Sequence, residues 1–317
     1  MKKKWAVLCA TDVSAFPEVL DPLKDVAKVK ICKPGHDALL REIRDADAFI
    51  ASLHVRLDAE AIAAAKKLRV IATPSTKLDH LDLKAADARG ITLLSLKYDR
   101  EFLDTITATA EFAWALMLSC LRRIPWAFDA VKRGEWARDK FRGHQLSGKT
   151  FGILGYGRLG AMVGEYARAF RMRVLAHDFK DFQAEGIERV DKQTLFRESD
   201  VISLHVPLTP ETTNLVDRKE FALMKPGAII VNTSRGAIIN QEALLEAIKT
   251  GRIAGAGLDV IHWEWPDVKR HPLMEYARTH ENLVIVPHLG DITYESQAMS
   301  LHHIAEKLGD FIRADKE

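Results

Sequence analysis

The amino-acid sequence predicts an α/β protein of two domains, each built around a parallel β-sheet. Its 317 residues fit two domains, because most domains hold roughly 100–200 residues. Short apolar runs alternate with helix-like stretches through the first hundred residues, and a second alternation starts at residue 149. This alternation is typical of parallel strands joined by crossover helices.

The first alternation predicts five strands and two helices. One helix is expected at Asp58–Lys67, where Asp58 is a suitable N-cap, and the other at Leu81–Arg89, where Gly90 ends the helix. The strands are expected at Trp5–Cys9, Val29–Cys32, Ala48–Ala51, Val70–Thr73 and Thr92–Ser95.

A long helix is expected next, over Thr105–Arg123. It is apolar on nearly every side, which indicates burial between domains or between subunits. The segment that follows mixes lysine and arginine with large aromatic side chains, namely Trp126, Phe128, Trp136 and Phe141. These aromatic side chains either pack against their own domain or form a dimer arm, since Trp and Arg are favoured at interfaces.

The second alternation predicts a second parallel sheet. Its strands are expected at Thr150–Leu154, Arg173–His177, Asp200–His205, Ala228–Asn232, Ala254–Asp259 and Leu283–Val286. Helices are expected at Gly157–Phe170, Gln241–Thr250 and Tyr294–Arg313.

Composition excludes several classes of protein. The 46 basic and 44 acidic residues nearly balance, which argues against nucleic-acid binding through a broad basic surface. Cys9, Cys32 and Cys120 are far apart and show no zinc-binding spacing, so no metal site is predicted and a reducing cytoplasm is the simplest location. No apolar run approaches the roughly 18–20 residues of a membrane span, and the apolar stretch at the N-terminus is too short for a secretory signal.

A glycine-rich turn predicts a dinucleotide site. The sequence GYGRLG at 155–160 follows an apolar strand and opens an amphipathic helix. Gly155 permits the tight turn, Gly157 lets backbone amides approach a pyrophosphate, and Gly160 allows close contact between helix and sheet. Asp178 ends the next strand, where a carboxylate accepts hydrogen bonds from ribose hydroxyls and repels a 2′-phosphate. The turn therefore favours NAD over NADP, although Lys180 nearby weakens that discrimination.

Three residues further along the chain predict hydride transfer to or from a carbonyl beside a carboxylate. Arg235 follows a strand and can pair bidentately with a substrate carboxylate. His288 follows the last strand and can exchange a proton with the substrate oxygen near neutral pH. Glu264, in contact with His288, would favour the imidazolium form and raise its pKa.

With these motifs, nearly the whole chain resembles the D-isomer-specific 2-hydroxyacid dehydrogenases. The similar segments are LSGKTFGILGYGRLG at 146–160, HVPLTPET at 205–212, MKPGAIIVNTSRG at 224–236, GAGLDV at 255–260 and PHLG at 287–290. The resemblance implies Arg235, Glu264 and His288 as catalytic residues and NAD as cofactor. It implies that the cofactor is contacted by Gly155, Tyr156, Gly157, Arg158, Leu159, Asp178, His205, Pro207, Thr212, Thr233, Ser234, Asp259 and His288.

The resemblance also implies two doubly wound domains, one flavodoxin-like and one Rossmann, with the active site in a cleft between them. Residues 1–101 and 291–317 would form a discontinuous substrate-binding domain. Residues 102–290 would form the NAD-binding domain, whose arm at Thr105–Arg142 would join two copies into a homodimer. The partners implied are a small 2-hydroxy or 2-keto acid and a second copy of the chain, with no nucleic acid and no membrane.

The chain departs from the family at two places. The glutamate motif runs HWEWP at 262–266, and Glu264 is chosen because it lies five residues past Asp259. The substrate turn, TPSTKLDHLD at 73–82, lacks the glycines that the family has there. Ser75, Thr76 and Lys77 would occupy that turn, with Tyr98, Arg100 and Lys97 supplied by a second, charged segment at 95–104. Lys77, Lys97, Tyr98 and Arg100 would then face the cleft and recognise an extra anionic or polar group on the substrate. The alternative is that Lys77, Lys97 and Arg100 belong to a solvated, charged loop.

A second function class stays open, a non-catalytic NAD-sensing regulator on the same fold. Short-chain reductases are excluded, because none of the five tyrosines has lysine four residues further on. The sequence does not decide which 2-hydroxy acid is used, or whether oxidation or reduction is the physiological direction.

Overall fold

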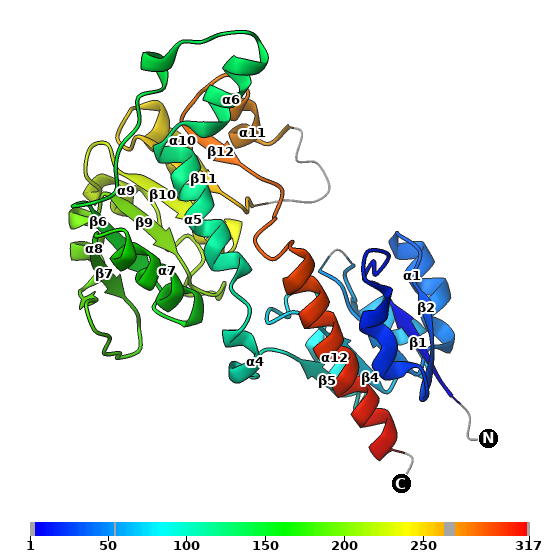
Figure 1. Ribbon diagram of the computed structural model, residues 1–317. Helices are drawn as coiled ribbons and strands as arrows, with labels where there is room; N and C mark the ends of the chain where they lie inside the picture. The colour runs from blue at the N-terminus through cyan, green and yellow to red at the C-terminus, as the bar shows by residue number, and fades with distance from the viewer. Residues whose placement is uncertain (1–3, 54, 263–269, 316–317) are drawn as a thin grey trace. The chain divides into compact units, whose positions relative to one another are not determined.

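The structure is a computed structural model that describes residues 4–53, 55–262 and 270–315. The chain forms two compact units (Figure 1), Met1–Ile106 with Thr293–Glu317, and Thr107–Ile292. Each unit is an α/β domain around a parallel sheet, as the sequence predicts. Within the described ranges, no helix is both long enough and apolar enough to cross a membrane.

The first unit holds a five-stranded sheet in which every pair of neighbours is parallel. The strand order β2-β1-β3-β4-β5 is the flavodoxin-like order, which reverses direction between β1 and β3. The strands are β1 (Trp5–Cys9), β2 (Ala27–Ile31), β3 (Ala48–Ile50), β4 (Val70–Thr73) and β5 (Thr92–Ser95).

Helices cover both faces of this sheet. One apolar core contains residues of η1 and α12, and the other contains residues of α1, α2 and α3. Asp58 and Asp82 begin α2 and α3 by accepting hydrogen bonds from the amides of Ala61 and Ala85. The helical elements are η1 (Pro17–Leu23), α1 (His36–Glu42), η2 (Ile43–Asp45), α2 (Ala59–Ala64), α3 (Leu83–Ala88), α4 (Arg100–Asp104) and α12 (Tyr294–Ala314).

The second unit holds a seven-stranded sheet, also parallel throughout. Its order, β12-β11-β10-β9-β6-β7-β8, is the Rossmann order with a seventh strand, and it reverses between β6 and β9. The strands are β6 (Thr150–Leu154), β7 (Arg173–His177), β8 (Glu188–Arg189), β9 (Val201–Leu204), β10 (Ile229–Asn232), β11 (Gly255–Leu258) and β12 (Leu283–Ile285).

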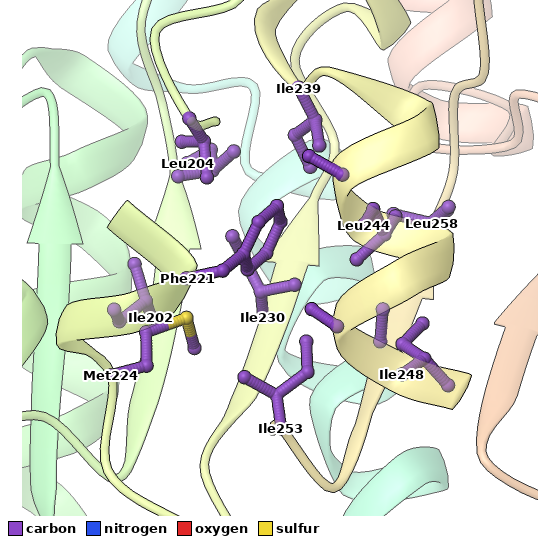
Figure 2. Packing of buried hydrophobic residues seen from close by; sticks show 14 of the residues in the cluster. Ile202, Leu204, Phe221, Met224, Ile230, Ile239, Leu244, Ile248, Ile253 and Leu258 are labelled. Atoms are coloured by element: carbon purple, nitrogen blue, oxygen red, sulfur yellow. The ribbon is translucent and has the colours of Figure 1, made fainter. Parts of the chain in front are cut away.

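Two apolar cores lie on opposite faces of this second sheet. The first contains side chains of α5 and α7, and the second contains side chains of α8, α9, α10 and α11. Figure 2 shows the second core, where Phe221 of α9 lies beside Ile230 of β10 and both are buried. The helical elements are α5 (Ala108–Leu121), α6 (Ile124–Lys132), η3 (Arg138–Phe141), α7 (Arg158–Ala169), α8 (Lys192–Glu198), α9 (Arg218–Leu223), η4 (Gly236–Ile238), α10 (Gln241–Lys249) and α11 (Pro272–Ala277).

The long helix predicted at Thr105–Arg123 is shorter than expected, and a second helix follows it directly. The helix α5 ends at Leu121 because Arg123 adopts left-handed backbone angles with φ of 55°. Pro125 then lies in the first turn of α6, where its missing N–H costs nothing. Trp126 packs against the core of its own unit, whereas Phe128 and Trp136 are 64% and 87% exposed.

Candidate functional site

The candidate site lies along one edge of the seven-stranded sheet. All its strands are parallel, so the segments that follow β6, β7, β9, β10, β11 and β12 leave the sheet at the same edge. Those segments carry the predicted cofactor and catalytic residues of this unit. Ligands of open α/β sheets bind at the carboxyl ends of the strands, where the strand order reverses. Here that reversal lies between β6, which leads to Gly155, and β9, which leads to His205.

The glycine turn has the geometry expected of a phosphate site. Gly155 has φ of +97°, and a Cβ there would lie 2.6 Å from the carbonyl oxygen of His205, so only glycine fits. Gly157 is the N-cap of α7 and provides no capping side chain, and the space where its Cβ would stand is open among the described residues. A pyrophosphate can therefore approach the N-terminus of this helix.

Asp178 holds the glycine turn in place. Its carboxylate oxygens accept hydrogen bonds from the amide of Tyr156 at 2.7 Å and from the amide of Lys180 at 2.9 Å. Tyr156 also stacks on Phe182 in the loop after Asp178, with ring centroids 4.3 Å apart. The carboxylate thus lies beside the turn, and each oxygen keeps a lone pair that can accept from a ribose hydroxyl.

Side-chain hydrogen bonds hold the loop after β9 in shape. The Nε2 atom of His205 lies 2.8 Å from the hydroxyl of Ser203. The buried hydroxyl of Thr212 donates to the carbonyl of Pro207 at 2.7 Å and accepts from the amide of Thr209 at 2.7 Å. Thr212 therefore fixes the shape of this loop, and its hydroxyl is already engaged within the chain.

The segment after β10 offers an unpaired polar group to a ligand. Thr233 is only 5% exposed, and no atom of the described part of the chain makes a hydrogen bond with its Oγ1. Ser234, by contrast, donates its hydroxyl to the carbonyl of Leu204 at 2.8 Å. A buried hydroxyl without a partner costs free energy, so Thr233 fits a site that a bound cofactor completes.

The turn that follows Arg235 is held on two sides. The amide of Asn214 donates to the carbonyl of Ala237 at 2.8 Å, and the amide of Val216 donates to the carbonyl of Ile238 at 3.1 Å. On the other side, a Cβ at Gly236 would overlap the backbone of Ile261 and His262, so this position requires glycine. The backbone that carries Arg235 is consequently fixed.

Asp259 connects the segments of Arg235 and His288. The side chain of Asn232 donates to the carbonyl of Arg235 at 3.0 Å, and the carbonyl of Asn232 accepts from the amide of Asp259 at 2.9 Å. The carbonyl of Asp259 in turn accepts from the amide of His288 at 3.0 Å. These three hydrogen bonds form a continuous path between the backbones of the two predicted catalytic residues.

The side chain of Asp259 also shapes the loop of His288. Its two oxygens accept from the amides of Leu289 at 2.6 Å and Gly290 at 3.0 Å. His288 has φ of 56°, which is a left-handed backbone conformation. This conformation is costly for residues other than glycine and persists where the surrounding structure imposes it. Burial raises the pKa of the Asp259 carboxyl, and the two amides oppose that shift.

Sequence reasoning placed Asp259 among the cofactor contacts and missed its contacts with the His288 loop. It also missed Asn232, although an amide side chain that directly follows three apolar strand residues is a signal of a buried polar role. Glu264 lies outside the described residues.

The predicted substrate turn belongs to the first unit, after β4. The buried hydroxyl of Thr73 accepts from the amide of Ser75 at 3.3 Å and lies 3.5 Å from Nε2 of His80. The hydroxyl of Ser75 accepts from the amide of Lys77 at 3.2 Å. Two backbone amides of this turn therefore already donate hydrogen bonds to side-chain hydroxyls.

The second predicted substrate segment is more exposed. The guanidinium of Arg100 pairs with Asp104, one turn further along α4, at 2.8 Å. Tyr98 is 85% exposed, and the ammonium of Lys97 lies 5.2 Å from the centre of its ring. The structure places Ser75, Thr76 and Lys77 at the carboxyl end of β4, and places Tyr98 and Arg100 after the carboxyl end of β5.

Similarities to known proteins agree with this geometry. Residues 114–290 match the family model of the D-isomer specific 2-hydroxyacid dehydrogenase, NAD binding domain. The chain is 38% identical to the glyoxylate reductase of Thermococcus litoralis, over 89% of this chain and 85% of that enzyme. It is 41% identical to a D-3-phosphoglycerate dehydrogenase of Archaeoglobus fulgidus, over 83% of this chain and 49% of that enzyme. The chain spans about half the length of the phosphoglycerate dehydrogenases that it matches.

The fold has close counterparts among solved structures. The D-lactate dehydrogenase of Aquifex aeolicus, solved with NAD and lactic acid, superposes with a TM-score of 0.83 at 27% identity, covering 98% of this chain and 96% of that one.

Proposed function

The chain belongs to the family of D-isomer-specific 2-hydroxyacid dehydrogenases, and we propose that it interconverts a D-2-hydroxy acid and its 2-keto acid with NAD. The observation that carries this proposal is the hydrogen-bonded path from Arg235 through Asn232 and Asp259 to His288. It joins a cation and an imidazole at the sheet edge where the glycine turn also lies, which suits a carboxylate, a carbonyl and a cofactor in one site.

The residues of the site divide the chemistry between them. When NADH is bound, it supplies the hydride that reduces the carbonyl carbon of the keto acid. Arg235 binds the substrate carboxylate and polarises the neighbouring carbonyl. His288 donates a proton to the carbonyl oxygen as negative charge develops there, and it takes this proton back in the oxidative direction. Glu264, which lies outside the described residues, is proposed as the carboxylate that orients His288.

Domain roles follow the same proposal. Residues 1–101 with 291–317 bind the substrate, and residues 102–290 bind NAD and form the subunit interface. The match of 114–290 to an NAD-binding domain supports the second role. A cytoplasmic location is the companion proposal, supported by three cysteines that are all free thiols.

The substrate is proposed to carry a second anionic group that Lys77 recognises. In an assay of NADH consumption over 2-keto acids, phosphorylated or dicarboxylic acids should be reduced with higher kcat/KM than pyruvate or glyoxylate. Lys77→Gln should lower kcat/KM for these acids by about 10- to 100-fold, since a hydrogen bond to a charged group contributes about 1.5–3 kcal/mol. Equal losses for pyruvate and for the larger acids would contradict the assignment of Lys77. No turnover of any keto acid would contradict the proposed function.

Asp178 is proposed to select NAD over NADP. Asp178→Ala should raise the KM for NAD relative to the KM for NADP by about 10-fold. NAD loses the hydrogen bond between its ribose and the carboxylate, whereas NADP is freed from the repulsion between the carboxylate and its 2′-phosphate. The variant also frees the amide of Tyr156, but that change affects both cofactors alike and cancels in the ratio. Asp181→Ala is the matched control, since Asp181 is exposed in the same loop and pairs with Arg189. An unchanged ratio of the two KM values would show that Asp178 does not select the cofactor.

A homodimer is proposed through α6 and the segment after it. Ile124, Phe128 and Val131 follow one another at helical spacing and are all exposed, as is Trp136. Apolar side chains at such positions are typical of an interface. Phe128→Asp should weaken the dimer by about 30-fold or more, the effect of losing a central interface residue.

Sedimentation velocity over a concentration series would measure this dissociation. Tyr294→Glu is the control, because Tyr294 is a similarly exposed aromatic residue in the other unit. A wild-type chain that stays monomeric at high concentration, or a Phe128→Asp variant that remains a dimer, would disprove this interface.

A further inference from the structure

A group of charged side chains joins two parts of the first unit that are far apart in the sequence. One carboxylate oxygen of Asp99, the residue before α4, lies 2.7 Å from Nε2 of His303 and accepts a hydrogen bond from Nζ of Lys307 at 3.3 Å. Lys307 also donates to the carbonyl of Ser95 at 3.3 Å. His303 and Lys307 are four residues apart on α12, so they lie on the same face of that helix. Asp99, His303 and Lys307 form the α4–α12 cluster.

The carboxylate of Asp99 serves this cluster instead of its own helix. Asp99 is the N-cap of α4, a position where an aspartate usually accepts a hydrogen bond from an amide of the first turn. Asp58 and Asp82 do so at α2 and α3, whereas Asp99 caps no amide of α4, all of whose residues the structure describes. The hydrogen bond with His303 holds the pKa of the Asp99 carboxyl below its usual value, so the carboxylate is the acceptor and His303 the donor near neutral pH.

His303 also contacts α4 through the face of its ring. The imidazole stacks on the ring of Phe102, with centroids 4.1 Å apart and planes 6° from parallel. Phe102 packs against the apolar core of the first unit, in which the next residue, Leu103, is buried. Ile304 and Leu308 of α12 are fully buried in the same core, so α12 is a stable support. His303 thus holds both the N-cap and the body of α4.

The segment that the cluster holds carries two of the predicted substrate residues. Tyr98 directly precedes Asp99, and Arg100 directly follows it. We propose that His303 and Lys307 are positioning residues for the substrate, because they fix Asp99 and with it the backbone that carries Tyr98 and Arg100. The contact of Tyr98 and Arg100 with the substrate rests on the proposed function, whereas the attachment of their segment to α12 does not.

Two substitutions of His303 separate its hydrogen bond from its ring. Phenylalanine keeps an aromatic ring on Phe102 but has no donor for Asp99. Glutamine places its amide nitrogen near the position of Nε2, so it keeps the hydrogen bond to Asp99 and loses the ring contact. We expect His303→Phe to raise the KM for the keto acid by about 10-fold, with kcat and the Kd for NADH close to those of the wild type. We expect His303→Gln to keep this KM within about twofold of the wild type.

A double-mutant cycle tests whether His303 acts through Asp99. Asp99→Asn combined with His303→Phe should raise the KM hardly more than His303→Phe alone, because the hydrogen bond between the two residues is already lost. His302→Phe is the matched control and should leave the KM unchanged, since His302 is the exposed neighbour of His303 on α12 and faces Glu306 at 3.4 Å. Single effects that simply add in the double variant would contradict the proposal.

Amide hydrogen exchange provides a readout that does not depend on turnover. The amides of Asp99 and Leu103 donate to the carbonyls of Leu96 and Asp99, within the segment that the cluster holds. Their exchange should be faster in His303→Phe than in the wild type or in His303→Gln. Unchanged exchange in His303→Phe, or faster exchange with an unchanged KM, would overturn the proposal. If the wild type reduces no keto acid, the proposed function fails, and the exchange comparison still decides whether the cluster holds the segment.

Discussion

Replacing His288 with asparagine should lower kcat for keto-acid reduction by about 10²- to 10⁴-fold, the usual contribution of a general acid. Asparagine has no proton to give near neutral pH, so the oxygen that receives charge during hydride transfer would have to be protonated by water. Measurement of kcat with saturating NADH and keto acid tests this expectation.

Asparagine is the informative replacement because of the backbone at this position. His288 has φ of 56°, and asparagine tolerates such left-handed angles better than most residues. The backbone amide of residue 288 still donates to the carbonyl of Asp259, and the amides of Leu289 and Gly290 still donate to its carboxylate. The loop should therefore keep its shape, and the loss should reflect the missing proton alone.

Binding of NADH gives the necessary contrast. Its Kd, measured by fluorescence titration, should change little in His288→Asn, because the glycine turn and Asp178 are untouched. His302→Asn is the control, since His302 lies on the surface of α12 and faces Glu306 at 3.4 Å. If His288→Asn turned over keto acid at the wild-type rate, the proton donor would have to be another group.

The strands of both sheets could be predicted because buried parallel strands are continuous apolar runs. Trp5–Cys9, Val70–Thr73 and Thr150–Leu154 begin and end where the sequence predicts. The short helices α8, α9 and α11 were not predicted. Each is only six or seven residues long, which is too short for a periodic pattern of apolar residues to reveal a helix. Each also begins at a residue whose side chain caps the helix, namely Asp191, Asp217 or His271.

The candidate site was predictable in its motifs but not in its contacts. The residues Gly155, Arg235 and His288 could be named because each follows an expected strand. The path through Asn232 and Asp259 depends on β10 lying next to β11, and strand order is a property of the whole sheet. The hydrogen bond from Thr212 to Pro207 and the ion pair between Arg100 and Asp104 likewise depend on local side-chain geometry. Glu264 and the substrate residues stay predictions.

Replacing Arg235 should give the second large loss, and two variants show what the guanidinium contributes. Arg235→Gln removes the charge and should lower kcat/KM by about 10²- to 10³-fold, as loss of a group that stabilises developing negative charge does. Arg235→Lys keeps the charge but loses the planar pair of donors. It should lose about 10- to 100-fold, because one hydrogen bond to a charged group is removed.

The fixed backbone makes the comparison between the two variants meaningful. Gly236 packs against Ile261 and His262, and Ala237 and Ile238 are bonded to the segment of Asn214 and Val216, so a new side chain at 235 starts from the same place. Arg218→Lys is the control, because Arg218 pairs at the surface with Glu246 in the same unit.

A lysine variant as active as the wild type would mean that charge alone is needed at position 235. A lysine variant as poor as the glutamine variant would mean that bidentate geometry decides. Wild-type kcat/KM in both variants would mean that Arg235 takes no part in the reaction. The path of hydrogen bonds to His288 would then only stabilise the fold. The expected order, with lysine between arginine and glutamine, requires both charge and geometry, as a substrate with a carboxylate beside the reacting carbonyl demands.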